Sequence, residues 1–441
     1  MTVRGLTINE RAGGETIVWG LGRHGGGLSV VRRVLRDGGQ VTVVDTRPAE
    51  DLRAELGEYA SRIRLLAETS DPVAALRTGV TLVVSPAIPP THAAWPAVRA
   101  ACNDRGVCVT TQFDILCEAI GDRRVLAVTG SNGKSTAAAW LMAVLRRGGM
   151  TAAIGGNFEN GLIGEPPLLD HVDRLPVDAV CVLEVSSFQL AVLRSQTLRP
   201  VAAAVLNVRP NHLDWHGTFP KYLAAKERLL RRASGVRLLP ADPADPVHQR
   251  WRDETRCVPI GGTGPADWPP TIREAAFVVT RLAAEVGVCI EDAELIAGRP
   301  QLPHRLEWVA ERGGVQFLDD SAATTPEATV SALHSVGRNV VLIIGGRNKG
   351  FDLDALARGV APRCVAAATI GETASVLAGR IAVHGGKVRS HRTMAAAVKW
   401  AAKICPAEGT VLLSPGMAST DLFADYRARG AAFRAAIPAE A

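Results

Sequence analysis

A glycine-containing turn between a strand and a helix constrains this chain more than any other feature. Residues 124–129 (RVLAVT) form the apolar run of a buried parallel strand, residues 130–136 read GSNGKST, and a helical pattern follows. Glycines let backbone N–H groups face a phosphate, and the start of the helix adds positive potential. The Lys134 ammonium would then contact the β- and γ-phosphates, and the Ser135 hydroxyl would bind Mg²⁺. Val128 stands where the usual eight-residue pattern has its first glycine, so this loop is a tighter variant.

An acidic residue, Glu184, follows the next buried strand, which we predict at residues 177–183. A carboxylate at the carboxyl end of such a strand lies beside the phosphate crevice of an open α/β sheet, where its oxygens can bind Mg²⁺. An isolated acidic residue at this position would more commonly cap the following helix. The phosphate loop upstream favours the metal role.

A histidine and a lysine follow the strand predicted at residues 201–206. His212 lies in NHLDWH, and Lys226 ends the sequence YLAAK. Taken alone, such residues are more commonly a structural histidine and a solvated helix lysine. These two positions therefore indicate no chemistry without further context.

The alternation of strands and helices extends along the whole chain. A strand at 16–19 leads into GLGRHG, a helix at 28–36 and a strand at 41–45, and another strand is predicted at 81–85. A loop rich in Pro, Gly and Asp precedes a helix predicted at 273–286. Four further strands are predicted in the last third of the chain, at 315–318, 340–344, 366–370 and 410–413. This alternation predicts an α/β protein made of open α/β domains.

The pattern GxGxxG in residues 20–25, followed by Asp45 after the second strand, has a competing interpretation. On its own it is typical of a dinucleotide-binding oxidoreductase, in which the acidic residue binds ribose hydroxyls. That interpretation does not explain the phosphate loop at 130–136.

Composition narrows the classes of function. The 441 residues carry a net charge of +6, but the arginines are scattered and form no basic run, so we expect no nucleic-acid binding. The 8 cysteines form no CxxC pair and no Cys/His metal spacing. The polar first residues do not resemble a signal peptide, and no apolar run approaches the ~20 residues of a membrane helix. We therefore expect a cytoplasmic protein without membrane insertion.

Several motifs occur in the order in which the Mur ligases have them. Besides TGSNGKST they are LEVSSFQL, NHLDWHG followed by YLAAK, LPHR at 302–305, DDSAATTPEAT at 319–329, GGRNK at 345–349 and LSPGMAST at 413–420. The chain resembles the Mur ligase family over essentially its whole length, most closely the branch that adds glutamate.

The resemblance implies three domains and one reaction. A UDP-binding Rossmann-like domain would span residues 1–121, a central ATP-binding domain 122–300, and a C-terminal Rossmann-like domain that binds glutamate 301–441. The implied enzyme is a monomer in peptidoglycan precursor synthesis. It joins D-glutamate to UDP-N-acetylmuramoyl-L-alanine (UDP-MurNAc-L-Ala) at the expense of ATP, by way of an acyl phosphate.

The resemblance also implies the site residues. It places two Mg²⁺ ions on Ser135, Glu184, His212 and Lys226, with Lys226 carbamylated, since a carbamate is an anionic oxygen ligand whereas an ammonium would repel the metal. Together with Lys134, the last three would be the catalytic residues. ATP contacts are implied at Gly130, Ser131, Asn132, Gly133, Lys134, Ser135, Thr136, Arg305 and Asp320. Contacts with UDP-MurNAc-L-Ala and glutamate are implied at Gly22, Arg23, His24, Asp45, Thr46, Arg47, Ser85, Asn157, Ser186, Gln189, Thr324, Lys349, Ser419 and Tyr426.

The sequence departs from the family pattern around ATP and the amino acid. Residues 270–274 (PTIRE) stand where the family has a His-Asn-x-x-Asn segment near the adenine, and Ala322 replaces a lysine. Tyr426 takes the place of a phenylalanine near the glutamate. D-Glutamate is therefore the family default. A ligase that uses L-glutamate or another amino acid, and a non-catalytic UDP-sugar-binding protein, remain alternatives.

Overall fold

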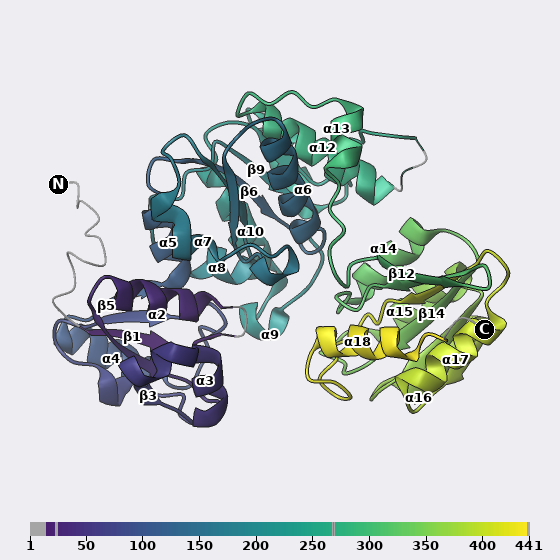
Figure 1. Cartoon of the computed structure of the whole chain (residues 1–441), viewed down its shortest axis with the longest axis horizontal. Coiled ribbons are helices and arrows are strands. Elements are labelled where there is room, and N and C mark those ends of the chain that lie inside the picture. Colours follow the sequence, from purple (N-terminus) through teal and green to yellow (C-terminus); the bar gives the residue numbers. More distant parts are fainter. Residues whose placement is uncertain (1–14, 23–24, 267, 269, 439–441) are drawn as a thin grey trace. The chain divides into compact units, whose positions relative to one another are not determined.

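The computed structural model describes residues 15–22, 25–266, 268 and 270–438 (Figure 1). The chain divides into two compact units. The first comprises the chain up to Gly264 together with Glu274–Arg299, and the second comprises Pro265–Arg273 together with the chain from Pro300. Among the described residues, no helix is both long enough and apolar enough to cross a lipid bilayer.

The first unit begins with a five-stranded parallel sheet. Alternate side chains of a strand point to opposite faces, so Val18 packs with the apolar side chains of helices α2 and α5, whereas Ile17 and Trp19 pack with those of α4. The strands, in sheet order, are β3 (Arg64–Leu66), β2 (Gln40–Val44), β1 (Glu15–Trp19), β4 (Thr81–Val84) and β5 (Cys108–Thr111). The helices are α2 (Gly26–Arg36), α3 (Ala49–Leu56), α4 (Trp95–Arg105) and α5 (Gln112–Ile120), with short 3₁₀ turns η1 (Gly57–Arg62) and η2 (Val73–Ala75).

A second parallel sheet, of six strands, completes the first unit. Its strands, in sheet order, are β11 (Cys257–Pro259), β10 (Arg237–Leu239), β9 (Ala202–Val205), β6 (Arg124–Thr129), β8 (Val180–Glu184) and β7 (Ala152–Gly156). The central strands are apolar throughout because both of their faces are buried. The helices of this part are α6 (Lys134–Arg147), η3 (Asn160–Leu162), α7 (Leu168–His171), η4 (Val172–Arg174), α8 (Ser187–Val192), α9 (Leu213–His216), α10 (Phe219–Arg232), α11 (Pro246–Trp251), α12 (Pro270–Ala284) and α13 (Asp292–Ala297). The first four residues of α12 are grouped with the second unit.

The second unit holds a mixed sheet, which differs from the purely alternating pattern that we predicted. Strand β12 runs antiparallel to β13, because Gly313 and Gly314 both adopt positive φ and form a two-residue hairpin turn. The strands, in sheet order, are β12 (Glu307–Arg312), β13 (Val315–Asp319), β17 (Thr410–Leu413), β14 (Val340–Gly345), β15 (Ala366–Ile370) and β16 (Val388–Ser390). The helices are α14 (Pro326–Val336), α15 (Leu353–Val360), η5 (Ala361–Arg363), α16 (Ala374–Val383), α17 (Met394–Ile404) and α18 (Tyr426–Ala436).

A buried carboxylate joins the two sheets of the first unit. Asp114 of α5 accepts hydrogen bonds from the backbone N–H and the hydroxyl of Thr111, at 3.1 and 2.8 Å, which cap the helix. Its other oxygen accepts the backbone N–H groups of Arg194 and Ser195, at 2.8 and 2.7 Å, from the segment after α8. Because Asp114 is only 1% exposed, these donors have little access to water if the carboxylate is removed.

We expect Asp114→Ala to lower the free energy of unfolding by about 3 kcal/mol, because it leaves several buried donors unpaired. Chemical denaturation of the two proteins measures this difference. Asp173→Ala is the matched control, since it removes a carboxylate that is 43% exposed and bonded to Arg33 and Arg36. Asp173→Ala should lower the free energy of unfolding by about 0.5 kcal/mol. Equal losses in the two variants would contradict a joining role for Asp114.

Candidate active site

The loop after β6 has the backbone geometry of a tight phosphate-binding turn. Gly133 adopts a left-handed conformation (φ 82°) directly before α6, and a Cβ at Gly130 would lie 3.0 Å from the Leu206 side chain. Asn207 fixes the loop from behind, because its carbonyl and side-chain oxygens accept the N–H groups of Ser131 and Asn132 at 2.8 and 2.9 Å. Those two N–H groups are therefore not available to a phosphate. A phosphate would meet the N–H groups of the first turn of α6, which have no partner within the helix.

Two lysines converge on this loop. Lys134, at the start of α6, donates from Nζ to the carbonyl oxygen of Ser131 at 3.0 Å. Lys226 comes from α10 and donates to the carbonyl oxygen of Gly130 at 2.8 Å. Tyr222, one helical turn before Lys226, places its ring 4.8 Å from the Lys226 ammonium and its hydroxyl 2.8 Å from the Ser131 hydroxyl.

The Lys226 amine is only 1% exposed. Burial lowers the pKa of Lys226 well below its ordinary value, and the positive charge of Lys134 lowers it further, while Glu184 opposes the shift. An amine in this environment loses its proton far more easily than a surface lysine. A neutral amine is also the form that reacts with carbon dioxide.

Glu184 ends β8 and is 3% exposed. One carboxylate oxygen, Oε1, accepts a hydrogen bond from the Asn157 side chain at 3.1 Å. The other oxygen, Oε2, is buried and has no hydrogen-bond partner among the described residues. Burying a carboxylate oxygen without a hydrogen-bond donor destabilises the folded protein. Such an oxygen is a preferred ligand of hard cations such as Mg²⁺. The residues present therefore fit a divalent metal at Glu184.

The two lysines, Tyr222 and Asn157 line one cavity of about 350 Å³ at the carboxyl edges of both sheets in the first unit, and Glu184 lies behind Asn157 of this wall. Ten of the residues singled out in the sequence contribute to its wall: Gly22, Ser85, Gly130, Ser131, Lys134, Asn157, Ser186, Gln189, His212 and Lys226. Ser186 and Gln189 also form the capping box of α8, so their polar atoms are partly used within the helix. His212 has a left-handed backbone (φ 55°) and packs edge-on against Phe188.

The sequence analysis assigned no role to nine other residues of this wall, among them Gln112, Phe158, Phe188 and Tyr222. Gln112 directly follows β5 and lies so close to the glycine turn that a Cβ at Gly26 would collide with its amide. The rule that ligands gather at the carboxyl ends of parallel strands would have found Gln112. Strand β5, however, was not predicted.

The predicted residues after β2 have a different arrangement. The Asp45 carboxylate accepts the backbone N–H of Leu21 at 2.9 Å and bonds to the backbone and side chain of Arg47. Burial would raise the pKa of Asp45, but these hydrogen bonds outweigh it and the pKa lies below its ordinary value. Asp45 thus anchors the glycine turn through one oxygen and Arg47 through the other, which does not favour the dinucleotide interpretation. Thr46 is exposed beside it, and Arg23 and His24 lie outside the described residues.

The remaining predicted residues belong to the second unit. Lys349 is exposed on a loop that pairs with the loop before Ser419, through mutual hydrogen bonds between Arg347 and Ala418 at 2.9 and 3.1 Å. The carbonyl oxygen of Tyr426 accepts the Ser321 hydroxyl at 2.7 Å. Asp320, Thr324 and Arg305 lie on the neighbouring turns.

Asp320 is buried and fully engaged. Its carboxylate accepts the Ser414 hydroxyl at 2.7 Å and the backbone N–H of Leu306 at 3.2 Å. Burial raises the pKa of Asp320 to about 7, although these hydrogen bonds and Arg305 act against the shift. Thr324 follows on the same segment, where the carbonyl oxygen of Ala323 accepts the N–H of Gly416 at 2.9 Å. Asp320 therefore orders the turn that carries Arg305.

Arg305 itself is held by a strained turn. Both of its neighbours, His304 and Leu306, adopt positive φ, which is costly for residues other than glycine and is concentrated at functional sites. Its Nε is buried and has no hydrogen-bond partner among the described residues. A guanidinium presented in this way suits an anionic ligand.

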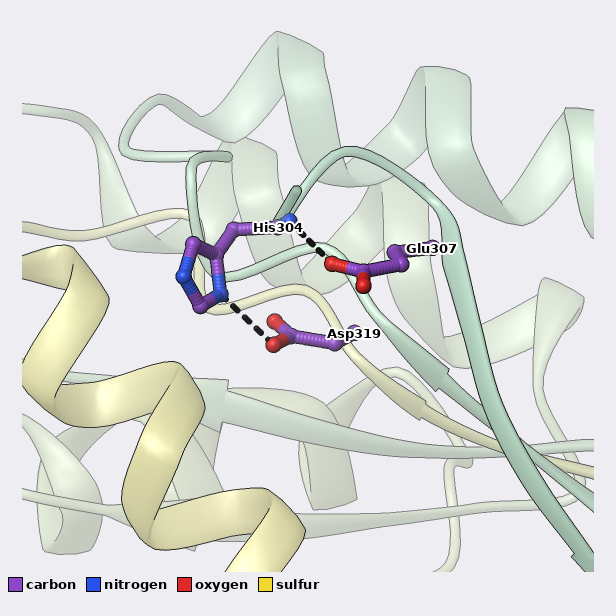
Figure 2. A group of neighbouring side chains, drawn as sticks. All are labelled: His304, Glu307 and Asp319. Carbon is purple, nitrogen blue, oxygen red and sulfur yellow. Dashed lines mark hydrogen bonds and ion pairs between the residues drawn. The ribbon is translucent and has the colours of Figure 1, made fainter. Parts of the chain in front are cut away.

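Figure 2 shows His304, Glu307 and Asp319, whose ligand atoms lie close enough together for a metal ion. His304 Nδ1 lies 2.7 Å from an Asp319 oxygen, and the His304 N–H donates to Glu307 at 2.7 Å. The Arg434 guanidinium already pairs with both carboxylates, at 3.3 Å from Asp319 and in a close contact with Glu307. The group is therefore an ion-pair cluster that fixes the turn before Arg305, and a cation has no place in it.

Comparisons with known proteins agree with this geometry. Residues 128–264 match the Mur ligase middle domain, and residues 304–417 match the Mur ligase glutamate ligase domain. The chain is 31% identical over 98% of its length, and 98% of the relative's, to a UDP-N-acetylmuramoylalanine–D-glutamate ligase of Burkholderia cenocepacia. It is 32% identical, with the same coverage, to the enzyme of that name from Burkholderia multivorans. The chain belongs to the Mur ligase family.

Solved structures of Mur ligases share its fold. The UDP-N-acetylmuramate–alanine ligase MurC of Thermotoga maritima matches with a TM-score of 0.59 at 15% identity, covering 95% of this chain and 98% of that one. MurF ligase of the same organism, solved with ADP, matches with a TM-score of 0.58 at 16% identity, covering 95% and 93%. As a Mur ligase, this protein is an ATP-dependent ligase of peptidoglycan precursor synthesis.

Proposed function

We propose that this Mur ligase joins D-glutamate to UDP-MurNAc-L-Ala and converts ATP to ADP and phosphate. The observation that carries the proposal is the cavity in which Lys134 and Lys226 converge on a phosphate-binding turn, with Glu184 bonded to Asn157 of its wall. The 31% identity to ligases named for this reaction supports the choice of substrates.

The proposed reaction has two steps. A carboxylate oxygen of the alanyl group attacks the γ-phosphorus of ATP, the bond to the β-phosphate oxygen breaks, and ADP leaves. The glutamate amine then attacks the acyl carbon of the acyl phosphate and loses a proton, and phosphate leaves from the tetrahedral intermediate. The Lys134 ammonium would neutralise charge that develops on the γ-phosphate, which is where such a reaction needs stabilisation.

Magnesium fits the residues of the cavity. Glu184 would hold one ion through the oxygen that lacks a partner, with the Ser135 hydroxyl as a further ligand, and His212 would belong to the site of a second ion. The metal would supply a Lewis acid for the phosphates. We propose that the neutral Lys226 amine adds carbon dioxide, forming an N–C bond and releasing a proton. The resulting carbamate would bring a negative oxygen ligand to a second ion.

The other contacts follow the family assignment. Gly22, Asp45, Thr46, Arg47 and Ser85 would contact the uridine nucleotide, and Asn157, Ser186 and Gln189 the muramoyl-alanyl part. Thr136 and the rest of the loop, with Arg305 and Asp320, would contact ATP, and Thr324, Lys349, Ser419 and Tyr426 the glutamate. We propose domains at residues 1–121, 122–300 and 301–441, a monomer, and a cytoplasmic location because ATP is the co-substrate.

Phosphate release with UDP-MurNAc-L-Ala, ATP and Mg²⁺ tests the proposal. We expect release that depends on D-glutamate and far slower release with L-glutamate or meso-diaminopimelate. Faster phosphate release with L-glutamate than with D-glutamate would show that L-glutamate is the substrate. No ADP formation with any amino acid, together with tight binding of the uridine nucleotide, would indicate a non-catalytic UDP-sugar-binding protein instead.

A further inference from the structure

A second cavity lies on the other side of the turn that presents Ser85. It encloses about 510 Å³ between α4, the end of β5, the last residues of α8 and the residues 193–194 that follow it, all within the first unit. Ser85 lines both this cavity and the active-site cavity, but neither the phosphate loop nor the segment at 45–47 reaches it. The volume is in the range of sites for small organic ligands.

The chemistry of the second cavity is apolar inside and cationic at the edge. Val98, Val109 and Leu193 contribute to its apolar wall. Arg99 lies over the Trp95 ring at 5.3 Å, and Arg194 donates to the carbonyl oxygen of Val109 at 3.1 Å. Both guanidinium groups are exposed, and neither forms an ion pair with a carboxylate of the described residues. Their charge complements an anion whose apolar body enters the cavity.

The wall of the second cavity is mechanically tied to the active site. The Trp95 indole N–H donates to the carbonyl oxygen of Pro89 at 2.9 Å, and the N–H of Ile88 donates to the carbonyl oxygen of Ser85 at 3.0 Å. Trp95 also packs edge-on against Trp19, whose carbonyl oxygen accepts the Ser85 N–H at 2.9 Å. A ligand against Trp95 therefore touches the same turn that presents Ser85 to the first cavity.

We propose that the second cavity binds a small organic anion with a flat apolar body, and that its occupancy alters the affinity for the uridine nucleotide through the Ser85 turn. The binding itself is independent of the enzyme's activity. Only the coupling rests on the proposed function.

Fluorescence titration with 8-anilinonaphthalene-1-sulfonate tests the binding. We expect one saturable site per chain in the wild type and about tenfold weaker binding in Arg99→Gln/Arg194→Gln, because two cationic contacts to the sulfonate are lost. Arg53→Gln/Arg62→Gln is the matched control, since it removes two exposed charges on α3 and η1 and should bind the probe like the wild type. Equal affinities in all three proteins would overturn the proposal.

A second variant tests the position of the site without changing charge. Asn103 is exposed on α4 and lines the cavity, so Asn103→Trp places an indole at the opening from a position that tolerates bulk. We expect it to weaken probe binding at least as much as the double arginine variant. Unchanged affinity would place the probe elsewhere and overturn the assignment.

Calorimetric binding of UDP-MurNAc-L-Ala at increasing probe concentration tests the coupling. We expect its Kd to shift and then level off when the second cavity is full. A Kd that rises without a ceiling would mean direct competition in the substrate site, and an unchanged Kd would mean no coupling; either outcome overturns the regulatory role. If the nucleotide does not bind even without the probe, the proposed function fails while the probe titration still stands.

Discussion

Lys134→Met should lower the rate of D-glutamate-dependent phosphate release by about a thousandfold. Its ammonium lies beside the loop carbonyl of Ser131 and faces the cavity, so methionine keeps the apolar stem and removes the charge that would meet the γ-phosphate. The loss of one preorganised donor to a developing charge costs about 10²–10³ in rate, and a full positive charge is worth at least as much. Initial-rate measurement of phosphate release at saturating ATP checks this expectation.

Lys221→Met is the matched control for Lys134→Met. Lys221 lies on α10 near the same cavity, but its side chain is exposed. The rate of phosphate release by Lys221→Met should stay within about twofold of the wild-type rate, because an exposed charge is screened by solvent. Near-normal phosphate release in Lys134→Met would contradict the assignment of residues 130–136 as the phosphate loop.

Lys226→Met should abolish ligation and at the same time stabilise the protein. The wild-type amine is buried and bonds to no carboxylate of the described residues, so folding must desolvate or deprotonate it. A methionine of similar length should raise the free energy of unfolding by about 1–3 kcal/mol, less the cost of leaving the Gly130 carbonyl without its donor. A residue that lowers stability but is retained for chemistry is typical of an active site. Activity and denaturation measurements on the same preparation check both expectations.

The stability gain of Lys226→Met should depend on pH. Because the pKa of Lys226 is lowered in the folded protein, the unfolded chain binds more protons and wild-type stability rises with pH. The difference in the free energy of unfolding between Lys226→Met and the wild type should therefore become smaller from about pH 7 to about pH 9, as the pH approaches the ordinary lysine pKa of ~10.4. A constant difference would mean that the lowered pKa is not the cause.

The carbamate proposal requires a separate variant. Lys226→Ala opens space beside Gly130, and a short-chain carboxylate added to the solution should restore part of the lost activity by supplying the missing oxygen ligand. In the wild type, activity should fall as the pH drops through the lowered pKa of Lys226, since an ammonium cannot react with carbon dioxide. Full activity of Lys226→Ala without added carboxylate would remove any metal role for this residue.

The sequence patterns located the strands that are continuous apolar runs. Strand β6 was predicted at 124–129 with the helix α6 starting at Lys134, and the structure has the same bounds. Strands β15 and β17 also match the predictions at 366–370 and 410–413. These strands are buried on both faces, so their apolar character depends little on tertiary context.

Other elements could not be found in the same way. Strands β10 and β11 have three residues each, and β5 has a polar sequence, CVTT, that lacks an apolar run. The strand predicted at 177–183 begins at Val180, and the helix predicted at 273–286 spans Pro270–Ala284. Length and burial in these cases are decided by neighbouring strands and helices, which no local pattern contains.

In the candidate site, too, some residues could be placed from the sequence and some contacts could not. The carboxyl-end rule placed Glu184 at the end of β8, where the structure has it. The sequence did not reveal that Asn207 accepts the N–H groups of Ser131 and Asn132. Nor did it reveal that the Asp45 carboxylate accepts hydrogen bonds from the Leu21 backbone and from Arg47. Such contacts depend on side-chain directions that only the folded structure fixes.

Transfer of labelled oxygen tests the acyl phosphate most directly. With ¹⁸O in both oxygens of the alanyl carboxylate, the proposed reaction moves one labelled atom into the phosphate released with each ligation and keeps the other in the new amide. Mass spectrometry of the released phosphate should therefore find one ¹⁸O atom per turnover. Unlabelled phosphate, with amide formed at the normal rate, would show that the carboxylate never attacks the γ-phosphorus and would contradict the account.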